Sequence, residues 1–540
     1  MNKEHTTVTG ALTECDLQYT AVDSINGIVS ELRTSFSSGT MRNISFRKQQ
    51  LRALLQGLRD EKQNILDAAF YDLQKSRSET DIYEYQAVIF EIGKFLENLD
   101  KWAKPEGNWL SMVQPAFLLS KSEVRKEPLG CVVIFGAWNY PLRLVLLPLV
   151  GALAAGNTAV IKPSELSPHT ALAIERMVNK YMDPKVVRVV QGAVDESTEL
   201  LKQKFDHYFY TGNGTVGKIV AHAAVEHHAG VTLELGGKCP AIVHADVTDL
   251  VPTAFRIMWA KLVNAGQTCV GVDYLLVHRS VKDKLVPLLV ETTKGMFGDS
   301  PQKAADYGRI INKRHWNRLM SVLNATEGTP INVTTDEADE NDRYIPPTIV
   351  DGVRGDDSLM RDELFGPILP IITYDTLSEA IDFVNSRDQP LSLYVFANKA
   401  SAEHVISQTR SGSASVNDTM FLLASHSTPF GGVGPSGVGR YTGKSSFDTF
   451  SHHRHVIKRP LWFPTPGVDS LRGPPFEGSA NSWKLPLGIS LVYPTVRPLR
   501  QNVFSKLLTF VPFWRLFVIL PAFLWALAVA KPTIKRRNGN

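Results

Sequence analysis

The spacing of apolar and polar positions changes along the chain and marks regions of different structure. Residues 22–109 carry helical periodicity, with long amphipathic stretches at 47–74 and 79–102 that contain no proline. From residue 131 on, short and continuously apolar runs alternate with helical patterns, which is typical of parallel strands buried on both faces. The pattern therefore predicts an α/β fold with a doubly wound parallel sheet. The strands expected in this sheet are 131–135, 158–162, 186–190, 207–211 and 231–235, with helices at 141–155, 170–180, 197–204 and 216–227.

A second alternating region follows at 241–430 and predicts a further α/β domain. Residues 460–500 are rich in Pro, Gly and Ser, which indicates a linker. The strands expected in the second region are 274–277, 348–350, 369–373 and 391–396.

The C-terminal segment 507–530 is apolar over 24 residues and carries one charge, Arg515. As a helix it would be roughly 36 Å long, enough to cross a hydrocarbon core of about 30 Å. Pro512 and Pro521 interrupt the helical hydrogen bonds, so a kinked or partly inserted segment is one alternative. A buried core helix is another, although a soluble helix of this length normally has a polar face. The segment is expected to anchor the chain in a membrane, and basic residues on both sides leave its orientation open.

Composition narrows the class of protein. The chain has 540 residues, of which 44% are hydrophobic and 21% charged, as in ordinary globular proteins. A formal net charge of +4 is too small for the basic surface of a nucleic-acid-binding protein. The polar first two dozen residues do not form a secretory signal, so the chain is expected to be intracellular. The four cysteines lack CxxC spacing, which argues against a disulfide scaffold and against a metal site; they are Cys15, Cys131, Cys239 and Cys269.

Two segments match the glycine pattern GxGxxG. The first, 212–217, lies between an expected strand and an expected helix, where backbone N–H groups can approach a pyrophosphate. The second, 432–437, precedes no expected helix and is interpreted as a turn-rich loop. In a dinucleotide-binding unit an acid about 20 residues further on holds the ribose, and this spacing nominates Glu234.

Other candidate residues follow the expected strands. Cys269 lies in a segment of small and polar residues, 264–269. A nucleophilic cysteine needs access and a lowered pKa, which a polar loop can provide. The alternative is that Cys269 is a small residue of the core. Asn139 follows the first strand and could donate to an oxyanion, or could simply form a turn before a proline. Lys162 and Glu165 follow the second strand and could reach a ribose, or form a solvated pair.

Taken in order, the motifs resemble the aldehyde dehydrogenase superfamily, in particular its class 3 branch of membrane-anchored fatty aldehyde dehydrogenases. The resemblance covers roughly residues 32–458. It is carried by FGAWNYP (135–141), KPSELS (162–167), YTG (210–212), LELGGK (233–238), GQTC (266–269), ELFGP (363–367), PFGGV (429–433) and SSFDTFSH (445–452).

The resemblance implies a covalent mechanism. Cys269 would attack the aldehyde, and the oxyanion would be held by the Asn139 side chain and the Cys269 backbone N–H. Glu234 becomes the general base for thioester hydrolysis rather than a ribose ligand. The acid at Glu165 disfavours the extra phosphate of NADP, so NAD is the expected cofactor, with NADP tolerance left open. The implied cofactor-binding residues are Lys162 and Glu165 at the adenine ribose, Gly212, Val216 and Gly217 at the pyrophosphate and adenine end, Glu363 at the nicotinamide ribose and Phe365 near the ring.

The resemblance also implies the domain organisation. We expect an NAD-binding domain (25–110 and 131–237), a catalytic domain (238–436), oligomerisation elements (111–130 and 437–459), a linker (460–506) and an anchor (507–530). A β-hairpin near 111–126 is expected to pair with a strand near 447–457 across a homodimer.

The expected activity is NAD-dependent oxidation of long apolar aldehydes to carboxylic acids, in lipid metabolism. An apocarotenoid aldehyde such as β-apo-4′-carotenal, or a hydroxybenzaldehyde, is an alternative substrate. A catalytically silent, membrane-tethered nucleotide-binding scaffold is the non-enzyme alternative. The catalytic domain is expected to be cytosolic, and the membrane could be the endoplasmic reticulum, the mitochondrial outer membrane or a lipid droplet.

Overall fold

The computed structural model describes residues 15–107, 120–425, 427–459 and 474. Internal contacts divide the chain into two units. The first comprises Met1–Lys104 and Lys126–His453, and the second comprises Pro105–Arg125 and Arg454–Asn540.

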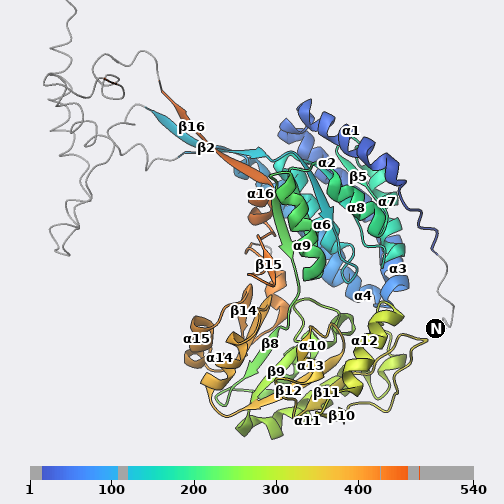
Figure 1. Ribbon diagram of the computed structural model, residues 1–540, viewed down its shortest axis with the longest axis vertical. Helices are drawn as coiled ribbons and strands as arrows, with labels where there is room; N and C mark the ends of the chain where they lie inside the picture. The colour runs from blue at the N-terminus through green and yellow to red at the C-terminus, as the bar shows by residue number, and fades with distance from the viewer. Residues whose placement is uncertain (1–14, 108–119, 426, 460–473, 475–540) are drawn as a thin grey trace, which may run out of the picture. The chain divides into compact units, whose positions relative to one another are not determined.

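The first unit contains a six-stranded sheet with the order β15-β7-β6-β3-β4-β5 (Figure 1). Neighbouring strands are parallel except for β15, which is antiparallel to β7. The chain builds β3, β4 and β5 outward and then returns to place β6 beside β3, so the direction of winding reverses between these two strands. Open α/β sheets bind ligands outside the carboxyl ends of their strands at such a reversal. The strands are β3 (Cys131–Phe135), β4 (Thr158–Lys162), β5 (Val187–Val189), β6 (His207–Thr211), β7 (Gly230–Glu234) and β15 (Gly437–Val438).

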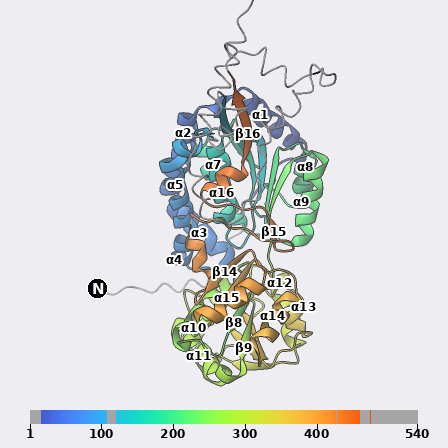
Figure 2. The same ribbon diagram turned by 90° about the vertical axis from the view of Figure 1, so that its left-hand side faces the viewer.

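Helices cover both faces of this sheet, as the doubly wound arrangement requires. Alternate residues of β3 belong to two separate apolar clusters: Val133 packs with α1, α8 and α9, whereas Val132 and Ile134 pack with α2, α5, α6 and α7. Figure 2 shows α2 and α5 on one side of the sheet and α8 and α9 on the other. Helix α6 is buried almost all round, because it lies between the sheet and other helices. The helices are α1 (Ile25–Ser37), α2 (Ile44–Asp60), α3 (Lys62–Leu73), α4 (Arg77–Thr80), α5 (Gln86–Trp102), α6 (Arg143–Ala155), α7 (Pro168–Tyr181), α8 (Val194–Lys202), α9 (Gly214–Glu226) and α16 (Lys444–Thr449).

A seven-stranded sheet with the order β10-β11-β12-β9-β8-β13-β14 forms the other half of the first unit, below the six-stranded sheet in Figure 1. Its strands are parallel except for β10. Its strands are β8 (Pro240–Val243), β9 (Tyr274–His278), β10 (Thr329–Asn332), β11 (Thr348–Asp351), β12 (Ile368–Tyr374), β13 (Ser392–Phe396) and β14 (Ser413–Val416). Its helices are α10 (Leu250–Leu262), α11 (Arg279–Phe297), α12 (Lys313–Asn324), α13 (Ser358–Arg361), α14 (Leu377–Asn385) and α15 (Lys399–Gln408).

The strands and helices expected in both α/β regions are found. The two amphipathic stretches expected before them are divided into shorter helices. The stretch 47–74 is not one helix, because α2 ends at Asp60 and α3 starts at Lys62. The stretch 79–102 begins with the end of α4 and a π-helical turn, Asp81–Tyr85, before α5 starts. Such turns place one additional residue in a helix and are frequent at functional sites.

A three-stranded sheet has the order β1-β2-β16 and consists of β1 (Glu106–Gly107), β2 (Lys121–Pro128) and β16 (Ser451–Lys458). The pairing expected across a dimer is therefore made within one chain. The reason is local: β2 leads directly into β3, and β16 follows α16, which contacts α6. Residues 437–438, at the start of the oligomerisation stretch expected at 437–459, form β15. This strand belongs to the six-stranded sheet, where it pairs with β7. Association of two chains through this sheet stays a prediction.

Among the described residues, no helix is both long enough and apolar enough to span a bilayer. The expected linker 460–506, apart from residue 474, and the expected anchor 507–530 lie outside the described residues.

Candidate active site

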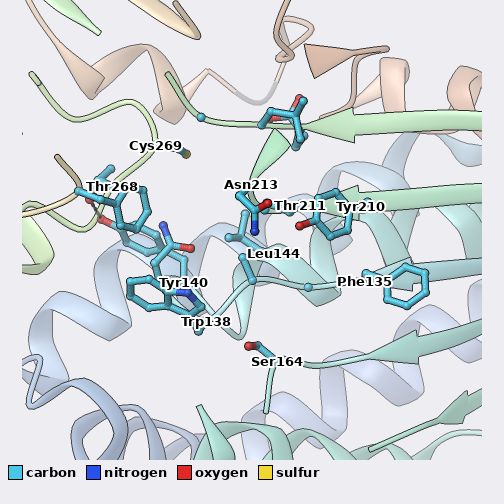
Figure 3. A pocket seen from close by; sticks show the side chains of 18 of the residues that line it. Phe135, Trp138, Tyr140, Leu144, Ser164, Tyr210, Thr211, Asn213, Thr268 and Cys269 are labelled. Atoms are coloured by element: carbon cyan, nitrogen blue, oxygen red, sulfur yellow. Dashed lines mark hydrogen bonds between the residues drawn. The ribbon is translucent and has the colours of Figure 1, made fainter. Parts of the chain in front are cut away.

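A cavity of about 1630 Å³ lies in the first unit, at the carboxyl ends of the parallel strands of the six-stranded sheet. Figure 3 shows Cys269 on one side of it, facing Trp138 and Tyr140, with Asn213 beyond the ends of the strands. Gly217 is the exception among the site residues expected from the sequence, because it is not part of the cavity wall. A Cβ on Gly217 would lie 2.9 Å from the Leu235 side chain, so this glycine lets α9 approach the sheet. The expected residues that do line the cavity are Asn139, Lys162, Glu165, Gly212, Val216, Glu234, Cys269, Glu363 and Phe365.

The loop that carries Cys269 has an unusual backbone. It follows α10, and the consecutive residues Asn264, Ala265 and Gly266 have φ angles of +52°, +51° and +78°. A left-handed conformation costs a residue with a side chain roughly 1–2 kcal/mol, so contacts around the loop must offset this cost. Glycine is required at 266, because a Cβ there would lie 2.3 Å from the carbonyl oxygen of Gly366.

Hydrogen bonds join the Cys269 loop to the loop that follows β3. The Asn139 side chain donates from Nδ2 to the Gln267 carbonyl at 3.0 Å, and Asn264 Nδ2 donates to the Asn139 carbonyl at 2.8 Å. Tyr140 and Thr268 share a hydrogen bond of 2.8 Å between their hydroxyl groups. A side-chain amide has two N–H donors, so Asn139 retains one beyond its bond to Gln267. Nucleophile and candidate oxyanion donor are thus held by one network.

The Cys269 thiol is not activated in this structure. Burial, the nearby Glu234 carboxylate and Glu363 raise its pKa to about 12, and Arg143 acts in the opposite direction. The lowered pKa expected for a nucleophile is therefore wrong for this state of the protein. The physical reason is that the surrounding carboxylates, together with desolvation, disfavour a thiolate more than one cation stabilises it.

Glu234 ends β7 and is 3% exposed. Its Oε1 has no hydrogen-bond partner among the described residues. Burial raises the pKa of Glu234 to about 8, against the effect of a backbone N–H from Gly432. The second glycine motif is the turn-rich loop expected, and it leads into β15, where Gly437 pairs with Glu234. A buried carboxyl group that changes protonation near neutral pH is suited to proton transfer.

Glu363 and Phe365 also line the cavity. Burial and the Asp273 carboxylate raise the pKa of Glu363 to about 8. Gly236 leaves room for this side chain, because a Cβ there would lie 2.2 Å from Glu363 Oε2. Phe365 has a φ of +53° and meets Trp138 edge to face, with 5.4 Å between ring centroids.

The remaining polar groups lie where β4 and β6 end. Lys162 Nζ donates to Glu165 Oε2 at 2.8 Å. Asn213 caps α9, its side chain accepting from the Val216 N–H at 3.0 Å. Asn213 therefore performs the normal role of a helix N-cap residue.

Three charged residues between α3 and α5 were not predicted as part of the site. Lys75 and Glu84 form a fully buried ion pair, and Glu84 Oε2 accepts from the Leu142 N–H at 3.0 Å. Glu79 contacts the Cys269 loop directly. In the sequence they resemble the polar positions of an amphipathic stretch, so only the three-dimensional arrangement identifies them.

Comparison with known proteins supports the family suggested by these motifs. Residues 12–456 match the aldehyde dehydrogenase family. The chain belongs to this family and is an NAD(P)-dependent aldehyde dehydrogenase.

Three relatives illustrate the similarity. Aldehyde dehydrogenase family 3 member A2 of Macaca fascicularis is 44% identical over 459 residues, 84% of this chain and 92% of the relative. The 4,4′-diaponeurosporen-aldehyde dehydrogenase of Staphylococcus aureus is 42% identical over 447 residues, 82% of this chain and 95% of the relative. A dimeric NADP-preferring aldehyde dehydrogenase of Canis lupus familiaris is 41% identical over 441 residues, 82% and 96% of the two chains.

Two solved structures share the fold. Staphylococcus aureus AldH in a substrate-bound state has a TM-score of 0.80 and 40% identity, and the match covers 85% of this chain and 98% of that one. A Mycobacterium tuberculosis aldehyde dehydrogenase complexed with NAD+ has a TM-score of 0.73 and 25% identity, covering 81% and 90%.

Proposed function

We propose that this enzyme oxidises long apolar aldehydes to carboxylic acids with NAD+ as its cofactor. The observation that supports this substrate class is the set of large apolar side chains in the wall of the cavity that also contains Cys269. Large apolar side chains line the cavity and still face solvent: Ile82 is 60% exposed, Phe90 49% and Phe421 67%. Such side chains can contact the chain of an apolar aldehyde and remove it from water.

The residues present fit NAD+. Gly212 and the N-terminus of α9 line the cavity, so backbone N–H groups are available for a pyrophosphate. The Lys162–Glu165 pair can hold a ribose, and the Glu165 carboxylate would repel an additional phosphate. Glu363, for which Gly236 leaves space, would hold the second ribose, with Phe365 beside the nicotinamide.

The chain's own residues perform the covalent steps in this proposal. Cys269 Sγ transfers its proton to solvent water and bonds to the aldehyde carbon, while the oxyanion accepts hydrogen bonds from Asn139 Nδ2 and the Cys269 N–H. When bound, NAD+ accepts the hydride that leaves this carbon. The resulting thioester is attacked by water, Glu234 takes the proton of that water, and the C–S bond breaks to release the acid and the thiol.

A second candidate substrate is an apocarotenoid aldehyde. The Staphylococcus aureus relative named for 4,4′-diaponeurosporen-aldehyde is about as similar to this chain as the family 3 member A2 relative. A long polyene aldehyde has the same apolar character as a fatty aldehyde, so the exposed apolar side chains fit both. A hydroxybenzaldehyde is the third candidate and would use only the inner part of the cavity.

The proposal includes the organisation of the whole protein. Residues 25–110 and 131–237 form the NAD-binding domain and 238–436 the catalytic domain. Residues 111–130 and 437–459 serve a homodimer, 460–506 form a linker, and 507–530 anchor the enzyme. The catalytic domain would face the cytosol, at the endoplasmic reticulum, the mitochondrial outer membrane or a lipid droplet.

The test is NADH production by detergent-solubilised full-length protein given hexadecanal, beside Cys269→Ala. We expect NADH from the wild type and a loss of at least about 1000-fold in the variant, which lacks the nucleophile. A matched Cys15→Ala control should retain full activity, because Cys15 does not line the cavity. Turnover of a benzaldehyde but not of hexadecanal would contradict the substrate class, and equal activity of Cys269→Ala would contradict the mechanism.

A further inference from the structure

The Cys269 loop forms a direct hydrogen bond with a residue of α4. Glu79 lies in α4, and its Oε1 accepts a hydrogen bond from the backbone N–H of Asn264 at 2.9 Å. Asn264 is the first of the left-handed residues that precede Cys269. The bond from Glu79 therefore acts where the loop leaves its helical conformation.

The side chain of Asn264 connects the loop that carries Cys269 to the loop that carries Asn139. Its Nδ2 donates to the Asn139 carbonyl at 2.8 Å and to the Gln267 carbonyl at 3.2 Å. Asn139 in turn donates to Gln267. A shift of Asn264 would consequently move the oxyanion donor and the nucleophile together.

We infer that Glu79 is a positioning residue for the nucleophile loop: its carboxylate holds Asn264 in the left-handed conformation and thereby sets the geometry of Cys269 against Asn139. This rests on the proposed role of Cys269 as the nucleophile. Glu79 does not line the cavity, so it acts through Asn264 and not on substrate or cofactor.

The charge state of Glu79 determines how strongly it can accept this bond. Burial raises the pKa of Glu79 to about 7, with Lys75 acting in the opposite direction. A carboxylate accepts a hydrogen bond more strongly than a neutral acid or amide, so the loop should be held most firmly above this pH. The titratable groups that face Glu79 are Lys75, Tyr83 and Glu84 from its own segment, and Tyr140 and Asp306 from other elements.

The first test compares Glu79→Leu and Glu79→Gln in the full-length enzyme. Leucine removes the acceptor, whereas glutamine keeps a neutral one. We expect Glu79→Leu to lower kcat roughly tenfold or more and to change the rate of Cys269 alkylation by iodoacetamide at least about threefold, with KM for NAD+ unchanged within about twofold. At pH 6, Glu79→Gln should have nearly the kcat of the wild type.

The second test is the ratio of wild-type to Glu79→Gln kcat across pH. The ratio should be near one at pH 6, where both side chains are neutral, and rise to about fivefold by pH 8.5, where only the wild type is ionised. Glu234 and Glu363 titrate in both proteins, so their contributions cancel in the ratio. This measurement also tests the role of Glu79 if the Glu79→Leu variant does not fold.

Glu175→Leu is the matched control, because Glu175 is a partly buried glutamate on α7 that accepts from Gln191 and lies outside the cavity wall. A purely structural effect would make Glu79→Leu and Glu175→Leu lose activity in parallel with their Tm values. That result, an unchanged alkylation rate, or a flat kcat ratio from pH 6 to 8.5 would overturn the inference. Alkylation is measured without turnover, so these outcomes are distinct from failure of the proposed function, which Cys269→Ala reports.

Discussion

At the scale of single residues, desolvation favours the neutral forms of the two groups expected to carry out the chemistry. Cys269 and Glu234 both favour their neutral forms near neutral pH. A neutral thiol and a neutral acid do not repel each other in a buried site, which limits the cost of placing them there. Activation must then come with binding or with rising pH.

Glu234→Gln should separate the two chemical steps. Glutamine cannot accept the proton of the hydrolytic water, whereas attack by Cys269 does not need that proton transfer. We expect one rapid equivalent of NADH per active site, followed by a steady state slower by roughly 100–10,000-fold. Rapid-mixing fluorescence of NADH measures both phases. Loss of the burst together with the steady state would contradict the assignment of Glu234 to hydrolysis alone.

The pH dependence of turnover follows from the same carboxyl group. Because the pKa of Glu234 is about 8, it is mostly protonated at pH 7 and acts as a base only as pH rises. The steady-state rate should therefore increase about 25-fold between pH 6.5 and 8.5, as long as hydrolysis limits it. A rate that falls over this range would contradict this role.

Titration of Glu234 should lower the stability of the protein as pH rises, whereas it increases the turnover rate. Its pKa is about 8 in the folded protein against an ordinary value of 4.5, so the native state binds more protons than the unfolded chain between these pH values. Unfolding free energy consequently falls as pH rises across this window. Glu234→Gln removes this loss, and its Tm should exceed that of the wild type by an increasing margin from pH 6 to 8.5. The exposed Glu31→Gln serves as the control, and an equal margin at all pH values would contradict the argument.

At the scale of elements, the strands were predictable because burial on both faces leaves continuous apolar runs. The ends of β3, β4 and β6 coincide with their sequence predictions. Strands β8, β10 and β14 were missed. The apolar run of β8 (PAIV) is only four residues long, and the small and polar residues of β10 (TPIN) and β14 (SASV) do not form such a run. The break between α2 and α3 at Glu61 was not predicted either, since glutamate is a good helix former.

The site was predictable to a similar extent. Motifs named Cys269, Glu234 and Asn139, because these residues follow recognisable strands and loops. The contact of Glu79 with Asn264 joins residues 185 positions apart, and no local pattern encodes it. The raised pKa of Cys269 was equally hidden, because it results from burial in the folded protein and from carboxylates on other elements.

The loop between β4 and α7 contains Glu165, which is expected to favour NAD over NADP. The variant Glu165→Gln tests this preference. This change removes the charge that repels a phosphate and frees Lys162 from its ion pair. The ratio of kcat/KM for NADP+ to that for NAD+ should rise about tenfold. The control is Glu199→Gln, which breaks the equivalent i,i+3 pair with Lys202 on α8 outside the cavity wall. An unchanged ratio would show that other residues determine the preference.

At the scale of the whole molecule, catalysis and membrane attachment are proposed to reside in different parts of the chain. Every residue that lines the cavity belongs to the first unit. The apolar segment 507–530 follows the last described strand by about 50 residues. Chemistry should therefore not depend on the anchor, whereas access to a substrate dissolved in a bilayer should.

Truncation after Arg459 separates these roles. With a short, water-soluble aldehyde, kcat should stay within about twofold of the full-length enzyme, because the cavity is intact. With hexadecanal in phospholipid vesicles, the rate at low enzyme concentration should fall about tenfold or more, since the enzyme no longer meets its substrate at the high local concentration of the membrane. Vesicle flotation should show that the full-length chain binds and the truncated chain does not. Detergent-dispersed hexadecanal is the control, because it removes the advantage of attachment and should restore equal rates. Loss of activity on the short aldehyde would instead show that residues beyond Arg459 stabilise the catalytic structure, and vesicle binding by the truncated chain would place the membrane contact elsewhere.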